Sequence, residues 1–273
     1  MRSVLDDIPV RAIKTGMLFS AETTRAVTAT LRAHFAAHGR IPLVCDPVCV
    51  STSGHVLLQP DAVGVIVREL FPLAQVITPN RAEAELLLGE RSMPCRIASL
   101  GDMLVAARNL LTFGSDAVLL KGGHMRVSED DVRSVRVPEG ARLHVRRAFG
   151  ENTEVLQRNG PGRVTDLVVD VLCQRGVDTI TLYPQPRLQS KSTHGTGCTL
   201  SAALVCALGN GIPGEACRQR RPNDFLFSYV AVEEAVAQAT LFTHLGIETA
   251  QPIGRGYGPL NHLHSVSTRV VPP

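Results

Sequence analysis

Short apolar runs that alternate with helical segments constrain this chain more than any other feature of its sequence. Runs rich in β-branched and other apolar residues occur at 41–46, 75–78 and 116–121. Segments with helical periodicity or capping signals lie at 21–38, 61–70, 81–88 and 100–113. Because each strand-like run is followed by a helix, the order predicts a mostly parallel sheet with helices on both faces, a three-layer α/β/α fold.

The second half of the chain departs from this alternation. Residues 126–163 are polar and rich in arginine, and we interpret them as a surface insertion. Residues 167–172 and 178–182 resemble antiparallel edge strands, and helices are expected at 198–208 and 225–245. The tail, 251–273, contains glycine and proline without a helical period. We expect a single domain over 1–250 followed by a linker or loose terminus.

The composition narrows the function classes. The chain has 273 residues and a net charge of +3, which gives no support to a nucleic-acid or membrane-surface role. The beginning of the chain lacks a signal peptide, and the apolar stretch at 198–212 is too short to span a bilayer. Its 7 cysteines match neither a zinc pattern nor a disulfide framework. We expect a cytoplasmic protein with reduced cysteines.

Polar residues follow several of the predicted strands. Asp46, Asn80 and Lys121 each stand at or just past a strand end, and Glu83 follows Asn80 by one helical turn. Alone, each has an ordinary explanation, as a turn former, a helix start or a solvated strand end. Ligands of open parallel sheets bind at the carboxyl ends of the strands. The joint placement therefore predicts a phosphate site, with Asp46 and Glu83 on Mg²⁺ and Lys121 on the nucleotide phosphates.

A glycine-rich turn precedes the helix expected at 198–208. Gly195, Thr196 and Gly197 expose backbone N–H groups beside the positive end of the helix dipole, which predicts an anion-binding site for a transferring phosphoryl group. The chain lacks the Gly-x4-Gly-Lys-Ser/Thr loop, so it is not a P-loop enzyme. Cys198 follows the turn, where the dipole favours a thiolate. The alternative is a small buried helix residue.

These segments carry a resemblance to a known family. The run Ser-Thr-His-Gly-Thr-Gly-Cys-Thr-Leu-Ser at 192–201 resembles the signature of hydroxymethylpyrimidine kinases, whereas most ribokinase-like enzymes have Asp at the position of Cys198. The segments 12–18, 46–54, 78–84 and 118–124 are also similar to this family and occur in its order. The resemblance extends over roughly residues 4–250.

The resemblance implies a reaction and a set of roles. The reaction is the ATP- and Mg²⁺-dependent phosphorylation of 4-amino-5-hydroxymethyl-2-methylpyrimidine and of its monophosphate in thiamine synthesis. Cys198 would activate the hydroxymethyl group, and the backbone from Gly195 to Cys198 would hold the phosphate. The remaining residues would bind the nucleotide (Asn80, Lys121, His194), the metal (Asp46, Glu83) and the pyrimidine (Met17, Gly16, Val48).

The chain also departs from the family pattern. The family's opening strand, with its glycine-rich segment, has no counterpart here. We therefore expect a ribokinase-like fold without its first strands, whose open, apolar sheet edge favours pairing with a partner, such as a second copy in a homodimer. The tail at 256–264 resembles the junction of fungal two-domain enzymes, in which a thiaminase-II-like domain follows.

Two alternative functions stay open from the sequence. One is a non-catalytic, truncated paralogue that binds nucleotide or a partner protein. The other is a pyridoxal-type vitamin kinase of the same superfamily. Cys198 and Met17 favour the pyrimidine branch over the pyridoxal branch, because the resemblance at these two positions is to pyrimidine kinases.

Overall fold

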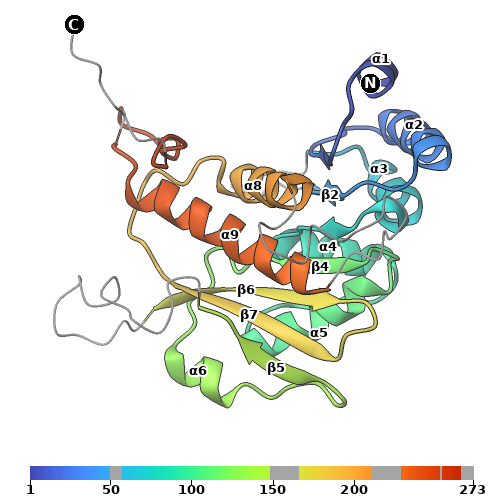
Figure 1. Ribbon diagram of the computed structural model, residues 1–273. Helices are drawn as coiled ribbons and strands as arrows, with labels where there is room; N and C mark the ends of the chain where they lie inside the picture. The colour runs from blue at the N-terminus through green and yellow to red at the C-terminus, as the bar shows by residue number, and fades with distance from the viewer. Residues whose placement is uncertain (50–56, 148–165, 211–228, 253, 266–273) are drawn as a thin grey trace, which may run out of the picture.

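The computed structural model describes residues 1–49, 57–147, 166–210, 229–252 and 254–265. Helices cover both faces of a seven-stranded sheet, which confirms the predicted α/β/α architecture (Figure 1). The strand order across the sheet is β1-β2-β3-β4-β6-β7-β5. The strands are β1 (Ile13–Thr15), β2 (Leu43–Cys45), β3 (Val76–Ile77), β4 (Ala117–Leu120), β5 (Arg142–Val145), β6 (Leu167–Gln174) and β7 (Thr179–Pro186).

Strands β1 to β4 are parallel neighbours, and β6 and β7 follow as the expected antiparallel pair. This pair is not the edge of the sheet, however, because β5 pairs in parallel with β7 outside it. Part of the segment 126–163 thus belongs to the fold and supplies β5 and the helix α6 (Glu129–Ser134). Leu143 of β5 packs against the core while its neighbours are exposed, as is usual for an edge strand. The part of this segment at 148–163 lies outside the described residues.

Two helical layers sandwich the sheet (Figure 1). Because side chains alternate along a strand, Leu43 and Cys45 of β2 join the core on one face, while Val44 joins the core beneath α8 and α9. Among the described helices, none has the length and apolar character needed to cross a bilayer. The helices are α1 (Arg2–Asp7), α2 (Ala21–His38), α3 (Ala62–Val65), α4 (Arg81–Glu90), α5 (Leu100–Leu111), α8 (Thr196–Asn210) and α9 (Tyr229–Glu248).

Local capping residues set several helix boundaries. Ser20 Oγ accepts a hydrogen bond from the Thr23 amide at 3.1 Å, and Gly39, at a φ of 85°, ends α2 where the sequence predicts. The single helix expected at 61–70 is instead split. It begins as α3, continues as a π-helical turn over Ile66–Leu70 and ends in a 3₁₀ turn over Phe71–Leu73. Pro72 lies in this last turn and lacks the N–H that an α-helix would need there.

Strand β1 lies at one end of the sheet, and β2 is its neighbour within the described part of the chain. Several large apolar side chains in the first 20 residues are exposed, among them Val4, Ile8 and Phe19. Exposed apolar side chains therefore occur in the segments that precede and follow β1.

Residues 254–265 of the tail contact the domain, whereas composition predicts a linker or loose terminus. The Gly258 amide donates to the Lys191 carbonyl at 3.1 Å, and the His194 amide donates to the Gly258 carbonyl at 3.2 Å. Leu260 is only 4% exposed, and Gly246 of α9 lies beside its side chain. The burial of this leucine and the backbone pairing hold residues 254–265 against the domain, which composition alone does not reveal.

Candidate active site

The register of the parallel strands brings the predicted polar residues to one edge of the sheet. Thr15 is level with Cys45, and Cys45 is level with Ile77, so the residues that follow these strands emerge together. A bridge between Asn80 and Lys121 continues the alignment to the next strand. The edge is the one at which open parallel sheets bind ligands.

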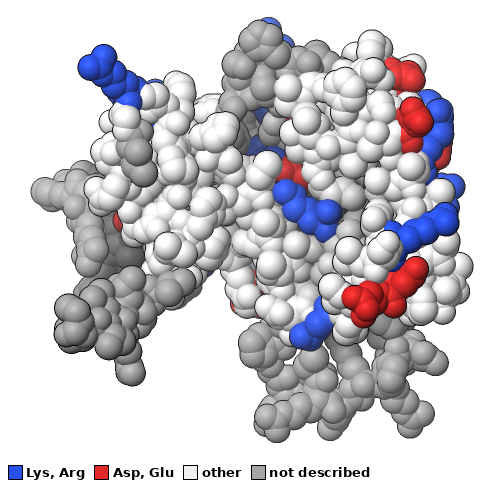
Figure 2. Space-filling view, turned by 90° about the horizontal axis from the view of Figure 1, so that it is seen from above, with Lys and Arg blue, Asp and Glu red and all other residues white. Residues whose placement is uncertain are grey.

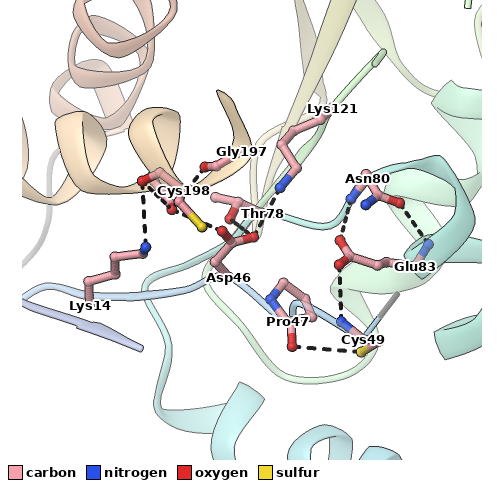
Figure 3. Close-up of polar contacts among 11 residues, drawn as sticks. Lys14, Asp46, Pro47, Cys49, Thr78, Asn80, Glu83, Lys121, Gly197 and Cys198 are labelled. Atoms are coloured by element: carbon pink, nitrogen blue, oxygen red, sulfur yellow. Dashed lines mark hydrogen bonds and ion pairs between the residues drawn. The ribbon is translucent and has the colours of Figure 1, made fainter. Parts of the chain in front are cut away.

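Asp46 is the centre of this edge, and it is 2% exposed. Its Oδ1 accepts hydrogen bonds from Lys121 Nζ at 3.0 Å and from Thr78 Oγ1 at 3.2 Å. Its Oδ2 accepts one from Ser201 Oγ of α8 at 3.0 Å. We call Asp46, Thr78, Lys121 and Ser201 the strand-end cluster; Figure 3 labels the first three. Both carboxylate oxygens are thus fixed by side chains from other elements.

Lys121 supplies a fixed positive charge to the cluster. Its side chain is 12% exposed and forms a salt bridge with Asp46. Burial favours the neutral amine, but the carboxylates of Asp46 and Glu83 outweigh burial, and the pKa of Lys121 is raised. The side chain therefore stays an ammonium ion, ready to attract an anion at this edge.

Glu83 lies on the other side of Lys121, in the first turn of α4. Its Oε2 accepts from the Asn80 amide at 2.8 Å, while Asn80 Oδ1 accepts from the Glu83 amide at 2.9 Å, a capping box. Its Oε1 accepts from the Cys49 amide at 3.1 Å. Burial raises the pKa of Glu83, and this effect exceeds the opposing effect of Lys121. Asn80 and Glu83 thus cap the start of α4. Glu83 also holds the Cys49 amide, and with it the segment that follows Asp46.

The turn from Gly195 to Cys198, which we call the α8 turn, begins the helix. Gly195 has a φ of 86°, and its carbonyl accepts from the Thr199 amide at 2.9 Å. Helix α8 begins at Thr196, earlier than the sequence indicates, so Cys198 lies within the first helical turn. Cys198 is exposed rather than buried, which contradicts the alternative of a small buried helix residue.

The α8 turn touches the strand-end cluster. Ser201 Oγ lies 3.0 Å from Asp46 Oδ2 and 3.2 Å from the carbonyl oxygen of Cys198. A Cβ added to Gly197 would lie 3.1 Å from Lys121 Nζ, so this glycine leaves room for the ammonium group. The Cys198 side chain points toward Asp46 (Figure 3). A thiol, a cation and a carboxylate from distant parts of the sequence thus meet in one place.

The other predicted residues lie around this centre. Gly16 and Met17 follow β1, and Met17 is 53% exposed. Val48 follows Asp46 by two positions and has a φ of 45°, a strained value for a β-branched residue and one that often accompanies functional sites. His194 is exposed, and its backbone, rather than its ring, contacts the tail.

Sequence reasoning assigned no role to three side chains of this site. Thr78 directly follows β3, and Ser201 lies in the apolar helix α8, about one helical turn after Cys198. Lys14 of β1 donates to the carbonyl of Cys198 at 3.5 Å (Figure 3). The only sequence signal was the helical spacing of Ser201, because the other contacts depend on how the strands are ordered.

The donor set fits a magnesium ion that is shared with phosphates. In the described part of the chain, no group of three or more His, Cys, Asp or Glu residues could hold a metal by itself. Magnesium commonly takes one or two carboxylates and completes its shell with phosphate and water oxygens. Asp46 adds to the burial that raises the pKa of Glu83, so a cation between these carboxylates would relieve their repulsion.

The surface above the sheet carries few charged side chains (Figure 2). Blue and red side chains occur together near the centre of this view, within a largely uncharged surround, and others gather along one border. This face therefore presents a small central group of charges rather than one wide charged patch. It is suited to a small ligand that is bound by a few placed charges.

Solved structures of the same fold belong to small-molecule kinases. The pyridoxal kinase of Bacillus subtilis, solved as an ADP complex, has a TM-score of 0.65 at 24% identity, with 97% of this chain and 76% of that chain covered. The phosphomethylpyrimidine kinase of Clostridium difficile has a TM-score of 0.55 at 26% identity, with coverages of 89% and 71%. The fold is therefore that of the ribokinase-like kinases.

Sequence comparison identifies the family within this fold class. The family model described as phosphomethylpyrimidine kinase matches residues 1–155 and 150–219. The hydroxymethylpyrimidine/phosphomethylpyrimidine kinase of Rhizobium meliloti is 34% identical over 269 residues, which span 97% of this chain and 75% of that protein. The chain belongs to the phosphomethylpyrimidine kinase family.

A longer relative shares the same region. The thiamine biosynthesis bifunctional protein ThiED of Geobacter sulfurreducens is 35% identical over 261 residues. The match spans 96% of this chain and 40% of that protein. The region that matches this chain thus makes up most of the Rhizobium meliloti kinase and less than half of the bifunctional protein.

Proposed function

We propose that this protein transfers the γ-phosphoryl group of ATP, with Mg²⁺, to 4-amino-5-hydroxymethyl-2-methylpyrimidine and then to the resulting monophosphate. The observation that carries the proposal is the exposed thiol of Cys198 in a glycine-flanked helix start, next to the buried Lys121–Asp46 pair. Family membership supports the same reaction, since the relative from Rhizobium meliloti is named for both pyrimidine kinase activities.

The nucleotide phosphates would lie between Lys121 and the α8 turn. Lys121 supplies a point positive charge, and the amides of the turn lie at the positive end of the dipole of α8. Asp46 and Glu83 would hold Mg²⁺ together with the phosphates, and the ion would neutralise the charge that develops during transfer. Asn80 and His194 would border the nucleotide. ATP as the donor is supported by a fold neighbour, the pyridoxal kinase of Staphylococcus aureus, which was solved with AMP-PCP.

Cys198 would act on the acceptor hydroxyl. Cys198 would act here as a thiolate. As the hydroxymethyl oxygen attacks the γ-phosphorus, its proton passes to this sulfur to give the thiol, and ADP leaves with the electron pair of the broken P–O bond. The thiol can reach a substrate because it is exposed at the start of α8. By contrast, burial raises the pKa of the Cys45 thiol to about 12, so that nearby cysteine is unsuited to this role.

The pyrimidine would bind over the ends of β1 and β2. Met17 is exposed there, and its polarisable thioether is suited to packing on a flat ring. Gly16 and Val48 would complete this side of the pocket. The left-handed backbone of Val48 directs the chain away after Asp46, and strain of this kind is usually kept for a function.

The test is ADP release by the purified chain with Mg²⁺ and ATP, with the pyrimidine, its monophosphate or pyridoxal as acceptor. We expect turnover with both pyrimidines, and a decrease in kcat of about 100-fold for Cys198→Ala. Cys206→Ala is the matched control, because it removes another exposed thiol of α8 outside the site, and it should leave kcat unchanged.

Three outcomes would contradict the proposal. Turnover with pyridoxal alone would assign the chain to the pyridoxal branch. Nucleotide binding without turnover on any acceptor would indicate a non-catalytic protein. An equal loss in Cys198→Ala and Cys206→Ala would remove the special role of the first thiol.

A further inference from the structure

The tail residues 256–264 connect helix α9 to the catalytic face of the domain. On the α9 side, the Asn261 amide donates to the Gly246 carbonyl at 2.9 Å. Asn261 Nδ2 donates to Thr249 Oγ1 at 3.2 Å, and the rings of His264 and Phe242 lie 4.5 Å apart. Figure 1 shows the tail returning from the end of α9 toward the start of α8. One side of the tail is therefore anchored on a long helix.

The other side of the tail holds the loop that leads into the α8 turn. Gly258 is buried, and its amide donates to Lys191 while its carbonyl accepts from His194. A parallel bridge between His194 and Pro259 extends this pairing. The loop thus has backbone contacts with the tail immediately before Gly195.

A side-chain relay reaches the turn itself. His262 Nε2 lies 2.9 Å from Thr199 Oγ1, and this hydroxyl donates to the Gly195 carbonyl, also at 2.9 Å. Because the hydroxyl proton is used on Gly195, His262 Nε2 is the donor to Thr199 in this arrangement. Thr199 is 8% exposed whereas His262 is exposed, so the end of this relay at Thr199 is the part that is shielded from water.

The α8 turn needs such support because of its own composition. Gly195 and Gly197 give the backbone more conformational freedom than other residues would, and Gly195 uses it at a φ of 86°. An anion hole stabilises a transferring phosphoryl group only if its donors are already oriented. Contacts that restrain the turn therefore act on catalysis rather than on overall stability alone.

We propose that His262 is a positioning residue, which acts through Thr199 to fix the α8 turn on the γ-phosphate of the nucleotide. This inference rests on the proposed function, since it assigns the transferring phosphate to that turn. The tail would then be part of the active site, and His262 would act on the α8 turn through Thr199 rather than on the reacting atoms.

The test combines binding and turnover in the full chain. For His262→Ala and Thr199→Val, we expect the affinity for AMP-PCP with Mg²⁺ to decrease by about tenfold, and kcat to decrease by a similar factor. The affinity for ADP should decrease by a clearly smaller factor, because ADP lacks the γ-phosphate. His262→Gln, which keeps a donor, should restore part of the loss, and the double variant should be no worse than either single variant.

His264→Ala is the matched control, because it removes a tail histidine that contacts α9 but not α8. Thermal unfolding curves of all variants show whether each protein is folded. Equal losses for AMP-PCP and ADP, or equal losses in His262→Ala and His264→Ala, would mean that the tail only stabilises the domain and would overturn the inference. Wild-type behaviour of His262→Ala in every assay would also overturn it.

The two proposals can fail separately. If the wild-type chain binds AMP-PCP but does not turn over, the kinase reaction fails, while a selective loss of AMP-PCP binding in His262→Ala still supports the positioning role. If the wild-type chain turns over and His262→Ala is unaffected, only the positioning role fails. A wild-type chain that binds neither nucleotide would refute both.

Discussion

The strand-end cluster and the α8 turn are neighbours that are built in opposite ways. In the cluster, both oxygens of Asp46 accept hydrogen bonds from side chains, and the carboxylate is almost fully buried. In the turn, Cys198 is exposed, and backbone contacts with Gly195 and the tail hold the chain in place. The difference shows that the charges of the cluster are already paired within the protein, whereas the thiol of the turn stays accessible, as the proposed function requires.

The largest effect should come from removing the cation of the cluster. Lys121→Met leaves the buried carboxylate of Asp46 without its ion pair, and breaking a buried pair from one side typically costs about 3 kcal/mol or more. We expect a decrease of that size in the free energy of unfolding, measured by urea denaturation, together with loss of ADP release.

Lys14→Met is the matched control on the side of the turn. Lys14 makes a single long contact with the carbonyl of Cys198, so its removal should change the free energy of unfolding by less than about 1 kcal/mol. If both lysine variants lost the same stability, the contrast between a paired cluster and an open turn would be wrong.

A second effect concerns Asp170, a carboxylate near Lys121, and how it makes the free energy of unfolding depend on pH. Asp170 accepts a hydrogen bond from the Gly122 amide at 2.8 Å, and burial raises the pKa of Asp170 from 3.8 to about 6. Between these two values the unfolded chain releases this proton before the folded chain does. This carboxyl group therefore lowers the free energy of unfolding as the pH rises from about 4 to 6.

Asp170→Asn should remove this slope, because an amide oxygen can accept from Gly122 but does not ionise. Between pH 4 and pH 7, the free energy of unfolding of the variant should rise by about 2 kcal/mol relative to that of the wild type. This is less than the full pKa shift implies, because Asp170 is not completely buried. The measurement is urea denaturation across this range. Asp178→Asn, at an exposed position, should follow the wild-type profile, and parallel profiles for all three proteins would contradict the expectation.

The smallest effect tests the point at which the two regions meet. Gly197→Ala places a Cβ 3.1 Å from Lys121 Nζ, so the flexible end of the lysine must move. Alanine also favours the helix, which offsets the cost, and we expect the free energy of unfolding to stay within about 1 kcal/mol of the wild type. Turnover should decrease by about tenfold, because the ammonium group leaves the phosphate site.

Gly89→Ala is the comparison for this variant, since Gly89 lies in α4 with no atom within 4 Å of the added Cβ. It should be slightly more stable than the wild type and equally active in the ADP-release assay. Unchanged turnover in Gly197→Ala would show that turnover does not depend on the position of Lys121 Nζ relative to the α8 turn.

The sequence predicted those parts of the fold that depend on neighbouring residues. Ser20 and Gly39 marked the bounds of α2 correctly, because capping and a left-handed glycine act within one helical turn. The alternation of strands and helices predicted the parallel half of the sheet, and the edge at which Asp46 and Lys121 meet followed from it.

The sequence was less informative where short polar segments join the fold. The strand β5 lies in a segment that composition marks as an insertion, and its four residues carry only a weak alternating pattern. The tail has the glycine and proline content of a linker, yet backbone hydrogen bonds with Lys191 and His194 fix its described part against the domain. Composition reflects the local conformational preference of a segment, but it does not predict the tertiary contacts that the segment makes.

The sequence by itself determined the family, the alternation of strands and helices in the parallel half of the sheet, and the polar residues that follow its strands. Only the tertiary structure decided that Ser201 reaches Asp46 from 155 positions away and that His262 reaches Thr199 from 63 positions away. Local patterns follow from backbone geometry and capping, which act over a few residues. Contacts of this kind depend instead on how the sheet and its helices pack, because packing alone brings distant side chains within hydrogen-bonding distance.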